Sequence, residues 1–137
     1  MSLPKKISIL GAGQAGAYAA SEIRKYDKKS EVTIFSEESY LPYERPPLSK
    51  EAIIGKKNFE ELSFFSKSFY DVENINIKYQ AVEKVNFEKK ILITKDNQNH
   101  SYDSLLIATG SKNKQLSYDK ENQDIKDSIF YLRNIED

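Results

Sequence analysis

The fold is decided by the stretch KISILGAGQAG, residues 6–16, and by the runs that follow it. A β-prone run at 7–10 stops at Gly11, and residues typical of helices fill 14–26 without a proline. The run VTIF at 32–35 is again rich in β-branched residues. This order predicts a strand, a glycine turn, a helix and a second strand, which together form a right-handed parallel crossover.

The glycines of the predicted turn, Gly11, Gly13 and Gly16, have the spacing G-x-G-x-x-G, and Glu37 follows the second predicted strand. In such a unit the first glycine permits a tight turn, the second lets a pyrophosphate approach the backbone, and the third lets the helix lie close to the strand. The N–H groups at the start of the helix then face the phosphates. Glu37 can accept both hydroxyls of an adenosine ribose and would repel a 2′-phosphate. The motif therefore predicts a site for FAD or NAD, not NADP; a glycine turn beside a solvated glutamate is the alternative.

The rest of the chain predicts an α/β protein. We expect a loop at 36–48, then two short helices at 49–54 and 59–72. A strand at 75–79, an antiparallel β-meander at 82–102 and a strand buried on both faces at 105–108 should follow. A polar mobile loop at 112–127 and a last strand at 129–132 complete the expected order. Ser49 is expected to cap the first of these helices. In the helix at 14–26, Glu22, Arg24 and Lys25 are expected to face water. The fold class is a Rossmann-type parallel sheet with a small antiparallel insertion, in one domain over 1–137.

The composition argues against several classes of function. The chain has 137 residues, with 21 basic and 21 acidic side chains, and no cysteine. Zero net charge argues against nucleic-acid binding, because neutralising phosphates needs a surplus of Lys and Arg. No disulfide or thiolate nucleophile is available, and one histidine, His100, supports no strong transition-metal site. His100 falls in a predicted hairpin loop and is expected to be solvated, and no catalytic residue is predicted. The apolar run near the N-terminus is too short for a signal peptide or a membrane span, so we expect a cytoplasmic protein.

Two further stretches carry a resemblance to a known family. Residues 40–50, YLPYERPPLSK, resemble the signature loop of the FAD-dependent ferredoxin and rubredoxin reductases that serve oxygenases and cytochromes P450. Residues 101–111, SYDSLLIATGS, are similar to the Y-D-x-L-x-x-A-T-G segment of the same superfamily of flavoproteins with two dinucleotide sites. Residues 129–133, IFYLR, are similar to the stretch that leads those proteins into their NAD domain. The resemblance extends over nearly the whole chain, and R-P-P-L-S-K is its most specific part.

The resemblance implies a set of cofactor contacts. It places Gly11, Gly13, Ala15 and Gly16 on the FAD pyrophosphate, Glu37 on the adenosine ribose, Arg45 and Lys50 on the phosphate and flavin side, the backbone of Val82 on the adenine, and Ala108, Thr109 and Gly110 over the cofactor. Arg45 offers a forked donor to anionic oxygens, and Lys50, at a helix start, brings positive charge to the flavin ring. Two positions depart from the family pattern: Gln80 stands where glycine is usual, and Asp96-Asn97 replaces Asp-Gly in a hairpin.

In the family, FAD takes hydride from NAD(P)H and electrons then pass singly to a ferredoxin or rubredoxin. This sequence contains one G-x-G-x-x-G motif, and neither the second glycine motif nor the later Gly-Asp segment is present. We therefore expect the N-terminal FAD-binding part of such a reductase, with an exposed sheet edge and a tendency to self-associate. The alternative is a stand-alone module that binds FAD or NAD without catalysis. A simple NAD-dependent dehydrogenase domain is disfavoured by the R-P-P-L-S-K and A-T-G segments.

Overall fold

The computed structural model describes residues 4–116 and 128–137. The chain divides into two compact units, Met1–Tyr43 with Ser63–Gly110 and Glu44–Leu62 with Ser111–Asp137. We call the first the sheet unit, because it contains every strand of the described residues, and the second the loop unit.

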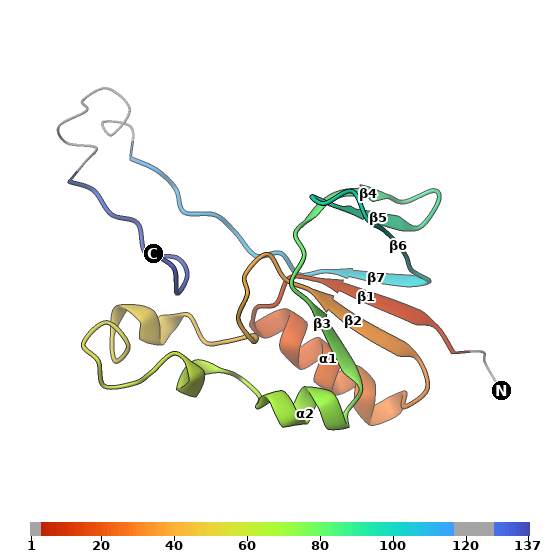
Figure 1. The fold of residues 1–137 in the computed structure, drawn as a ribbon, viewed down its shortest axis with the longest axis horizontal. Helices are drawn as coiled ribbons and strands as arrows, with labels where there is room; N and C mark the ends of the chain where they lie inside the picture. Colours follow the sequence, from red (N-terminus) through yellow and green to blue (C-terminus); the bar gives the residue numbers. More distant parts are fainter. Residues whose placement is uncertain (1–3, 117–127) are drawn as a thin grey trace. The chain divides into compact units, whose positions relative to one another are not determined.

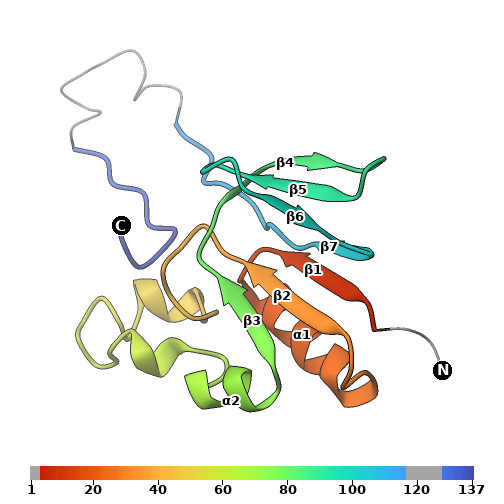
Figure 2. The same cartoon turned by 45° about the vertical axis from the view of Figure 1, so that its right-hand side comes forward.

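A four-stranded parallel sheet in the order β3-β2-β1-β7 forms the centre of the sheet unit (Figure 1). Its strands are β1 (Lys6–Leu10), β2 (Glu31–Phe35), β3 (Ile75–Lys78) and β7 (Ser104–Ile107). Helices α1 (Gln14–Tyr26) and α2 (Lys67–Val72) cover one face of the sheet. The antiparallel meander of β4 (Val82–Asn86), β5 (Ile91–Thr94) and β6 (Asn99–Ser101) lies on the other face (Figure 2). The predicted fold class is confirmed.

The main core lies between the parallel sheet and the two helices. It is formed by fully or nearly fully buried side chains of β1, β2, β3, α1 and α2: Ile9, Ala20, Val32, Ile34, Tyr70 and Ile75. Small residues on the inner face of α1, Gly16, Ala17 and Ala20, are buried and let the helix lie close to the sheet. The β1–α1–β2 crossover is held by this contact, as its sequence predicts.

A second core lies between the sheet and the meander, at the carboxyl end of the strands. Leu10 of β1 and Phe35 of β2 pack there with Leu92 and Tyr102, and all four side chains are buried. Towards the amino end the same sheet face carries polar side chains such as Ser8 and Thr33. The apolar half of the face therefore packs against the meander, and the polar half, whose Ser8 and Thr33 are buried, lines a hollow together with residues of β6.

The helix expected at 59–72 is wrong in its first half. A 3-10 turn at Glu60–Leu62 is followed by non-helical chain over 63–66, and α2 begins only after Ser66. An antiparallel bridge between Tyr43 and Ser63 holds the start of this segment, and the Ser66 hydroxyl caps α2 by accepting the N–H of the third helical residue. The apolar side chains that are spaced three or four residues apart therefore belong to separate short elements and not to one helix.

Strand β7 lies at the edge of the sheet, so the expectation of a strand buried on both faces is also wrong. Leu106 is 38% exposed and Ile107 is 56% exposed. A continuous apolar run is typical of a central parallel strand, and here only β1 pairs with β7 among the described residues.

In the loop unit the expected elements are replaced by tighter turns. Pro46–Ser49 is a 3-10 helix, η1, and Ser49 ends it instead of capping a helix at 49–54. Two prolines at the start favour this single turn, because their φ angles suit a first helical turn. Residues 129–132 form no strand, and the Tyr131 hydroxyl accepts the Leu116 N–H at 3.0 Å. Most of the loop expected at 112–127 lies outside the described residues.

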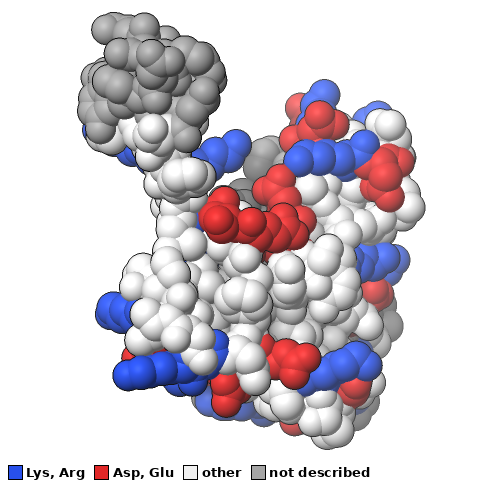
Figure 3. All heavy atoms as spheres, turned by 60° about the vertical axis from the view of Figure 1, so that its left-hand side comes forward, with Lys and Arg blue, Asp and Glu red and all other residues white. Residues whose placement is uncertain are grey.

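The surface carries charges of both signs. Figure 3 shows Lys and Arg side chains interspersed with Asp and Glu on one face, in keeping with the equal numbers in the sequence. Among residues 4–116 and 128–137, no helix has both the length and the apolar character that crossing a membrane requires.

Candidate dinucleotide-binding site

The candidate residues of the sheet unit gather where the parallel strands end. Leu10, the last residue of β1, pairs with Phe35 of β2 on one side and with Ile107 of β7 on the other. The glycine loop (11–16) leaves β1 at this edge, and 108–110 leave β7 beside it. The strand order reverses between β1 and β7, and such a point in an open parallel sheet is where ligands bind.

Gly11 and Gly16 sit where no larger residue fits. Gly11 has a φ of 109°, its N–H donates to the Phe35 carbonyl at 3.0 Å, and an added Cβ would lie 2.2 Å from the Ala108 carbonyl oxygen. An added Cβ on Gly16 would lie 2.0 Å from the Gly11 carbonyl oxygen. These glycines let the loop, the start of α1 and the 108–110 segment pack against one another.

Gly13 differs from both, because an added Cβ would meet no atom within 4 Å. Gly13 is the N-cap of α1, and the first helical hydrogen bond runs from the Ala17 N–H to the Gly13 carbonyl at 3.0 Å. No side chain caps this helix and its first turn carries no acid, while Gln14 and Ala15 are exposed. Open space therefore adjoins a helix start whose first N–H groups lack helical acceptors, which fits an approaching pyrophosphate.

Glu37 lies just beyond β2 and forms an ion pair that the sequence analysis missed. The Lys95 Nζ donates to Glu37 Oε1 at 2.8 Å, and the two side chains are 62% and 72% exposed respectively. The hydrogen bond to Glu37, and then its charge, raise the pKa of Lys95 above its ordinary value. The two residues are 58 positions apart, so no local pattern could have revealed the pair. An acid at this place suits ribose hydroxyls, and Lys95 offsets its charge.

Val82 is the first residue of β4 and pairs with Thr94 of β5. The two departures from the family pattern, Gln80 and Asp96-Asn97, lie close to these two residues in the sequence. Gln80 Nε2 donates to Asp96 Oδ2 at 2.9 Å, so the residue that replaces glycine is joined to the hairpin turn between β5 and β6. Asn97 in that turn has a φ of 59°, a conformation that Asn adopts more readily than other non-glycine residues. Asn97 therefore has the positive φ that glycine adopts easily, in the place where the family pattern has glycine.

The segment 108–110 is held at the edge of the sheet by its first residue. The Ala108 N–H donates to the Leu10 carbonyl at 2.8 Å, and Thr109 and Gly110 are exposed. The structure therefore brings this segment against the glycine loop, through the close approach of Ala108 to Gly11.

Arg45 and Lys50 belong to the loop unit, whereas all other candidate residues belong to the sheet unit. Arg45 Nη1 donates to the Arg133 carbonyl at 2.5 Å, so it ties the R-P-P-L-S-K loop to the C-terminal residues. Lys50 is exposed and follows the end of η1, where its N–H donates to the Pro47 carbonyl at 3.0 Å. The expectation that Lys50 begins a helix is wrong.

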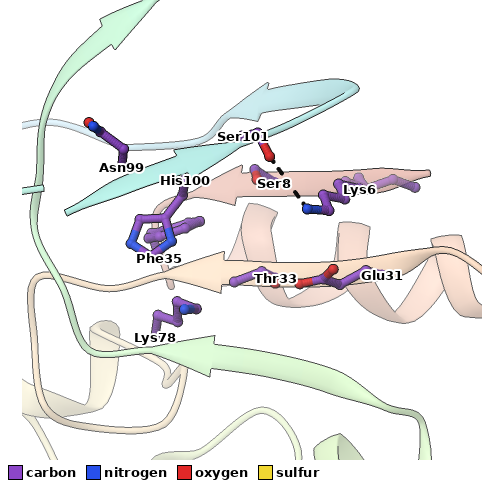
Figure 4. A pocket seen from close by; sticks show the side chains of 10 residues that line it. Lys6, Ser8, Glu31, Thr33, Phe35, Lys78, Asn99, His100 and Ser101 are labelled. Carbon is purple, nitrogen blue, oxygen red and sulfur yellow. Dashed lines mark hydrogen bonds between the residues drawn. The ribbon is translucent and has the colours of Figure 1, made fainter. Parts of the chain in front are cut away.

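A hollow of about 160 Å³ lies on the polar half of the sheet face, lined by side chains of β1, β2, β3 and β6 (Figure 4). No candidate cofactor residue lines it. His100 is on β6, not in a hairpin loop, and its ring packs edge-on against Phe35 with centroids 5.1 Å apart, so the expectation of a solvated side chain is wrong. Burial, and then the charge of Lys78, lower the pKa of His100. In the described part of the chain, His, Asp and Glu side chains form no group of three that could hold a metal ion.

Comparison with known proteins finds rubredoxin and ferredoxin reductases among the relatives of this chain. A rubredoxin-NAD(+) reductase of Ectopseudomonas oleovorans is 34% identical over 132 residues, which are 96% of this chain and 34% of that protein. The ferredoxin–NAD(+) reductase component of a p-cumate 2,3-dioxygenase system of Pseudomonas putida is 34% identical over 133 residues, 96% of this chain and 32% of that protein. The crystal structure of the covalent putidaredoxin reductase–putidaredoxin complex matches 99% of this chain and 33% of that chain, with a TM-score of 0.88 and 28% identity.

The chain therefore spans about a third of the length of these relatives. The pattern of the pyridine nucleotide-disulphide oxidoreductases matches residues 5–137. This confirms the resemblance to ferredoxin and rubredoxin reductases that the motifs carry. The chain belongs to the pyridine nucleotide-disulphide oxidoreductase family, whose members use FAD and NAD(P)H.

Proposed function

We propose that residues 1–137 are the N-terminal FAD-binding part of a reductase that passes electrons from NAD(P)H to a ferredoxin- or rubredoxin-type protein. The names of the relatives support the reaction class, since they are rubredoxin and ferredoxin reductases. Those proteins are about three times as long as this chain. We therefore propose only FAD binding for residues 1–137, and the complete reaction for a longer protein.

The observation that carries the proposal is the contrast among the three glycines of the loop. Gly11 and Gly16 are needed by the protein's own packing, whereas Gly13 faces open space at the start of α1. A glycine that the fold does not need, at a helix start, is what a backbone contact with a pyrophosphate requires.

Each candidate residue of the sheet unit then has a physical role. The N–H groups at the start of α1 donate to the phosphates, with Ala15 exposed beside them. Glu37 accepts the ribose hydroxyls, the backbone at Val82 lies against the adenine, and 108–110 close over the cofactor. Bound FAD would supply the two-electron to one-electron conversion, and the chain would bind and orient it.

Arg45 and Lys50 are proposed to bind the phosphate and flavin side of the cofactor. Arg45 has a planar guanidinium that can bind phosphate oxygens in forked fashion, and its bond to the Arg133 carbonyl already orients it. Lys50 is exposed and carries its charge at the end of η1, where it can meet an anionic ligand.

The test is a titration of the purified chain with FAD, followed by quenching of flavin fluorescence, with NAD as a competitor. We expect saturable FAD binding that NAD displaces poorly. Tight NAD binding without FAD binding would overturn the flavin assignment.

The variant Gly13→Ala makes the test specific to the loop. Its φ of −86° suits alanine and its Cβ meets no protein atom, so the melting temperature should fall only slightly, because Ala is a poorer N-cap than Gly. FAD affinity should fall about tenfold or more, because the methyl group occupies the path of the pyrophosphate. Gly55→Ala is not a suitable control, since Gly55 has a φ of 70°. Ala19→Gly, on the half-buried part of α1, changes one methyl group away from the loop and should leave FAD affinity unchanged.

A further inference from the structure

Lys95 is joined at both its backbone and its side chain to segments that the proposed site uses. Its N–H donates to the Ala81 carbonyl at 2.9 Å, next to Val82, which is assigned to the adenine. Its Nζ donates to Glu37 Oε1 at 2.8 Å, and Glu37 is assigned to the adenosine ribose. One residue therefore connects the adenine segment with the ribose acid.

The turn that presents Lys95 is held by side-chain hydrogen bonds. The Thr94 hydroxyl, which is buried, donates to the Asp96 carboxylate and accepts the Gln98 N–H at 3.1 Å. Gln80 Nε2 donates to the same carboxylate at 2.9 Å. Of these residues, Gln80 departs from the family pattern, whereas Asp96 keeps the Asp of the usual Asp-Gly pair. A braced turn aims the lysine at a fixed place, so the ion pair does not depend on the lysine side chain alone.

We propose that Lys95 is a positioning residue of the adenosine-ribose site, which holds the Glu37 carboxylate in the orientation that accepts the ribose hydroxyls. The proposal rests on the proposed function, since it assumes that this site binds an adenine dinucleotide. It adds a cation to a site for which the sequence indicated an acid alone.

The chemistry of the Lys95–Glu37 ion pair favours a lysine that positions the carboxylate over one that competes with the ribose hydroxyls for it. A carboxylate has two oxygens and about four acceptor positions, so a lysine and two hydroxyls can bind it together. Glu37 is 72% exposed, and a long exposed side chain loses rotamer freedom when it binds a ligand. A lysine that restrains the carboxylate beforehand reduces that loss, and it also lowers the repulsion between Glu37 and the ligand phosphates.

The experiment compares ADP with 2′-deoxy-ADP as competitors of bound FAD. The two nucleotides differ only in the 2′-hydroxyl, one of the two ribose hydroxyls that Glu37 is assigned to accept. The variants are Lys95→Met, Lys95→Arg and Glu37→Gln. Lys89→Met is the matched control, because it removes the same charge from the turn at the other end of β5.

The wild-type chain should prefer ADP to 2′-deoxy-ADP about tenfold, the effect expected for a hydrogen bond to a charged acceptor. Lys95→Met should reduce this preference to about threefold or less, and so should Glu37→Gln. The reduction is modest because an exposed ion pair contributes little free energy. Lys95→Arg and Lys89→Met should keep it. If Lys95 had only a structural role, its replacement would weaken the binding of both nucleotides equally and leave the ratio of their affinities unchanged.

The outcomes separate this inference from the proposed function. If the wild-type chain binds neither FAD nor ADP, the proposed function fails and this inference fails with it. If FAD and ADP bind and the ratio in Lys95→Met equals that of the wild type, the role of Lys95 is refuted while FAD binding stands. Tighter ADP binding by Lys95→Met would also refute it, because Lys95 would then compete with the ribose.

Discussion

Arg24 is the residue whose replacement should most disturb the sheet unit. It is 3% exposed, and its Nη1 donates to the Ser30 carbonyl at 2.6 Å and to the Asp27 carbonyl at 3.1 Å. Its Nη2 donates to the Asn74 carbonyl at 2.6 Å. These carbonyls lie at the end of α1, before β2 and before β3, so one guanidinium joins three elements at the edge opposite the proposed site.

The change we consider is Arg24→Met, which keeps much of the side-chain volume and removes every donor. A hydrogen bond from a charged donor contributes about 1.5–3 kcal/mol, and a carbonyl left unpaired in the interior costs about 1–3 kcal/mol. Because Arg24 Nε is itself buried without a partner among the described residues, removing it recovers part of that loss. We expect a net loss of about 3–5 kcal/mol from the free energy of unfolding, a large part of the ~5–15 kcal/mol of a typical domain.

The assay is urea denaturation with a thermal melt of the same samples. For a chain of this size the loss should lower the melting temperature by about 10–20 °C. Arg24→Lys should recover only part of it, because one ammonium cannot reproduce the planar fork. The control is Lys25→Met, which removes the neighbouring charge from a side chain that is 63% exposed and paired only at the surface with Glu22. It should change stability by less than about 0.5 kcal/mol. An Arg24→Met variant within 1 kcal/mol of the wild type would refute the assigned role of the guanidinium.

Four further outcomes are expected. Gly16→Ala should lower stability by about 2 kcal/mol or more in the same urea assay, because its Cβ would lie 2.0 Å from the Gly11 carbonyl oxygen; unchanged stability would show that the loop can shift. Tyr70→Phe should raise stability by about 1 kcal/mol, since the buried Tyr70 hydroxyl has no partner among the described residues, and a loss would reveal one. Hydrogen bonds from the Ser30 hydroxyl and from nearby backbone N–H groups lower the pKa of Asp27 from 3.8 to about 2, so its contribution to stability is complete above pH 4 and is lost as the pH falls towards 2. Asp27→Asn should therefore make the melting temperature fall less steeply over that range, and parallel curves would contradict this. Sizing chromatography should show association of the chain through the open edge of β7, which a strictly monomeric profile at high concentration would exclude.

The parts of the fold that could be predicted are those with a local cause. The crossover from 6 to 35 follows from hydrophobic periodicity interrupted by a glycine spacing, and every contact that defines it lies within one supersecondary unit. The helix at 59–72 could not be predicted correctly, because its apolar spacing suits both one helix and a set of turns. The bridge from Tyr43 to Ser63, between residues distant in the chain, decided between them.

In the interior of the sheet unit, too, contacts between distant segments decide features that the local sequence does not predict. Arg24 was expected to face water, because its neighbours in the helix are charged and charged residues are usually exposed. Three carbonyls from separate segments converge on it and satisfy its donors, so burial becomes favourable. Likewise, the apolar run of β7 indicated a central strand, and only the strand order shows that it forms an edge.

The sequence by itself determined the class of site: a glycine loop between a strand and a helix, followed by Glu37, specifies backbone N–H groups for phosphates and an acid for a ribose. The same spacing already assigned the turn to Gly11, the pyrophosphate to Gly13 and the helix packing to Gly16. What required the tertiary structure is that Gly11 is confined by the carbonyl of Ala108, in a segment that is distant in the chain. The tertiary structure also decided that Lys95 meets Glu37. Both facts arise from contacts between segments far apart in the chain, and a periodic pattern carries no information about such contacts.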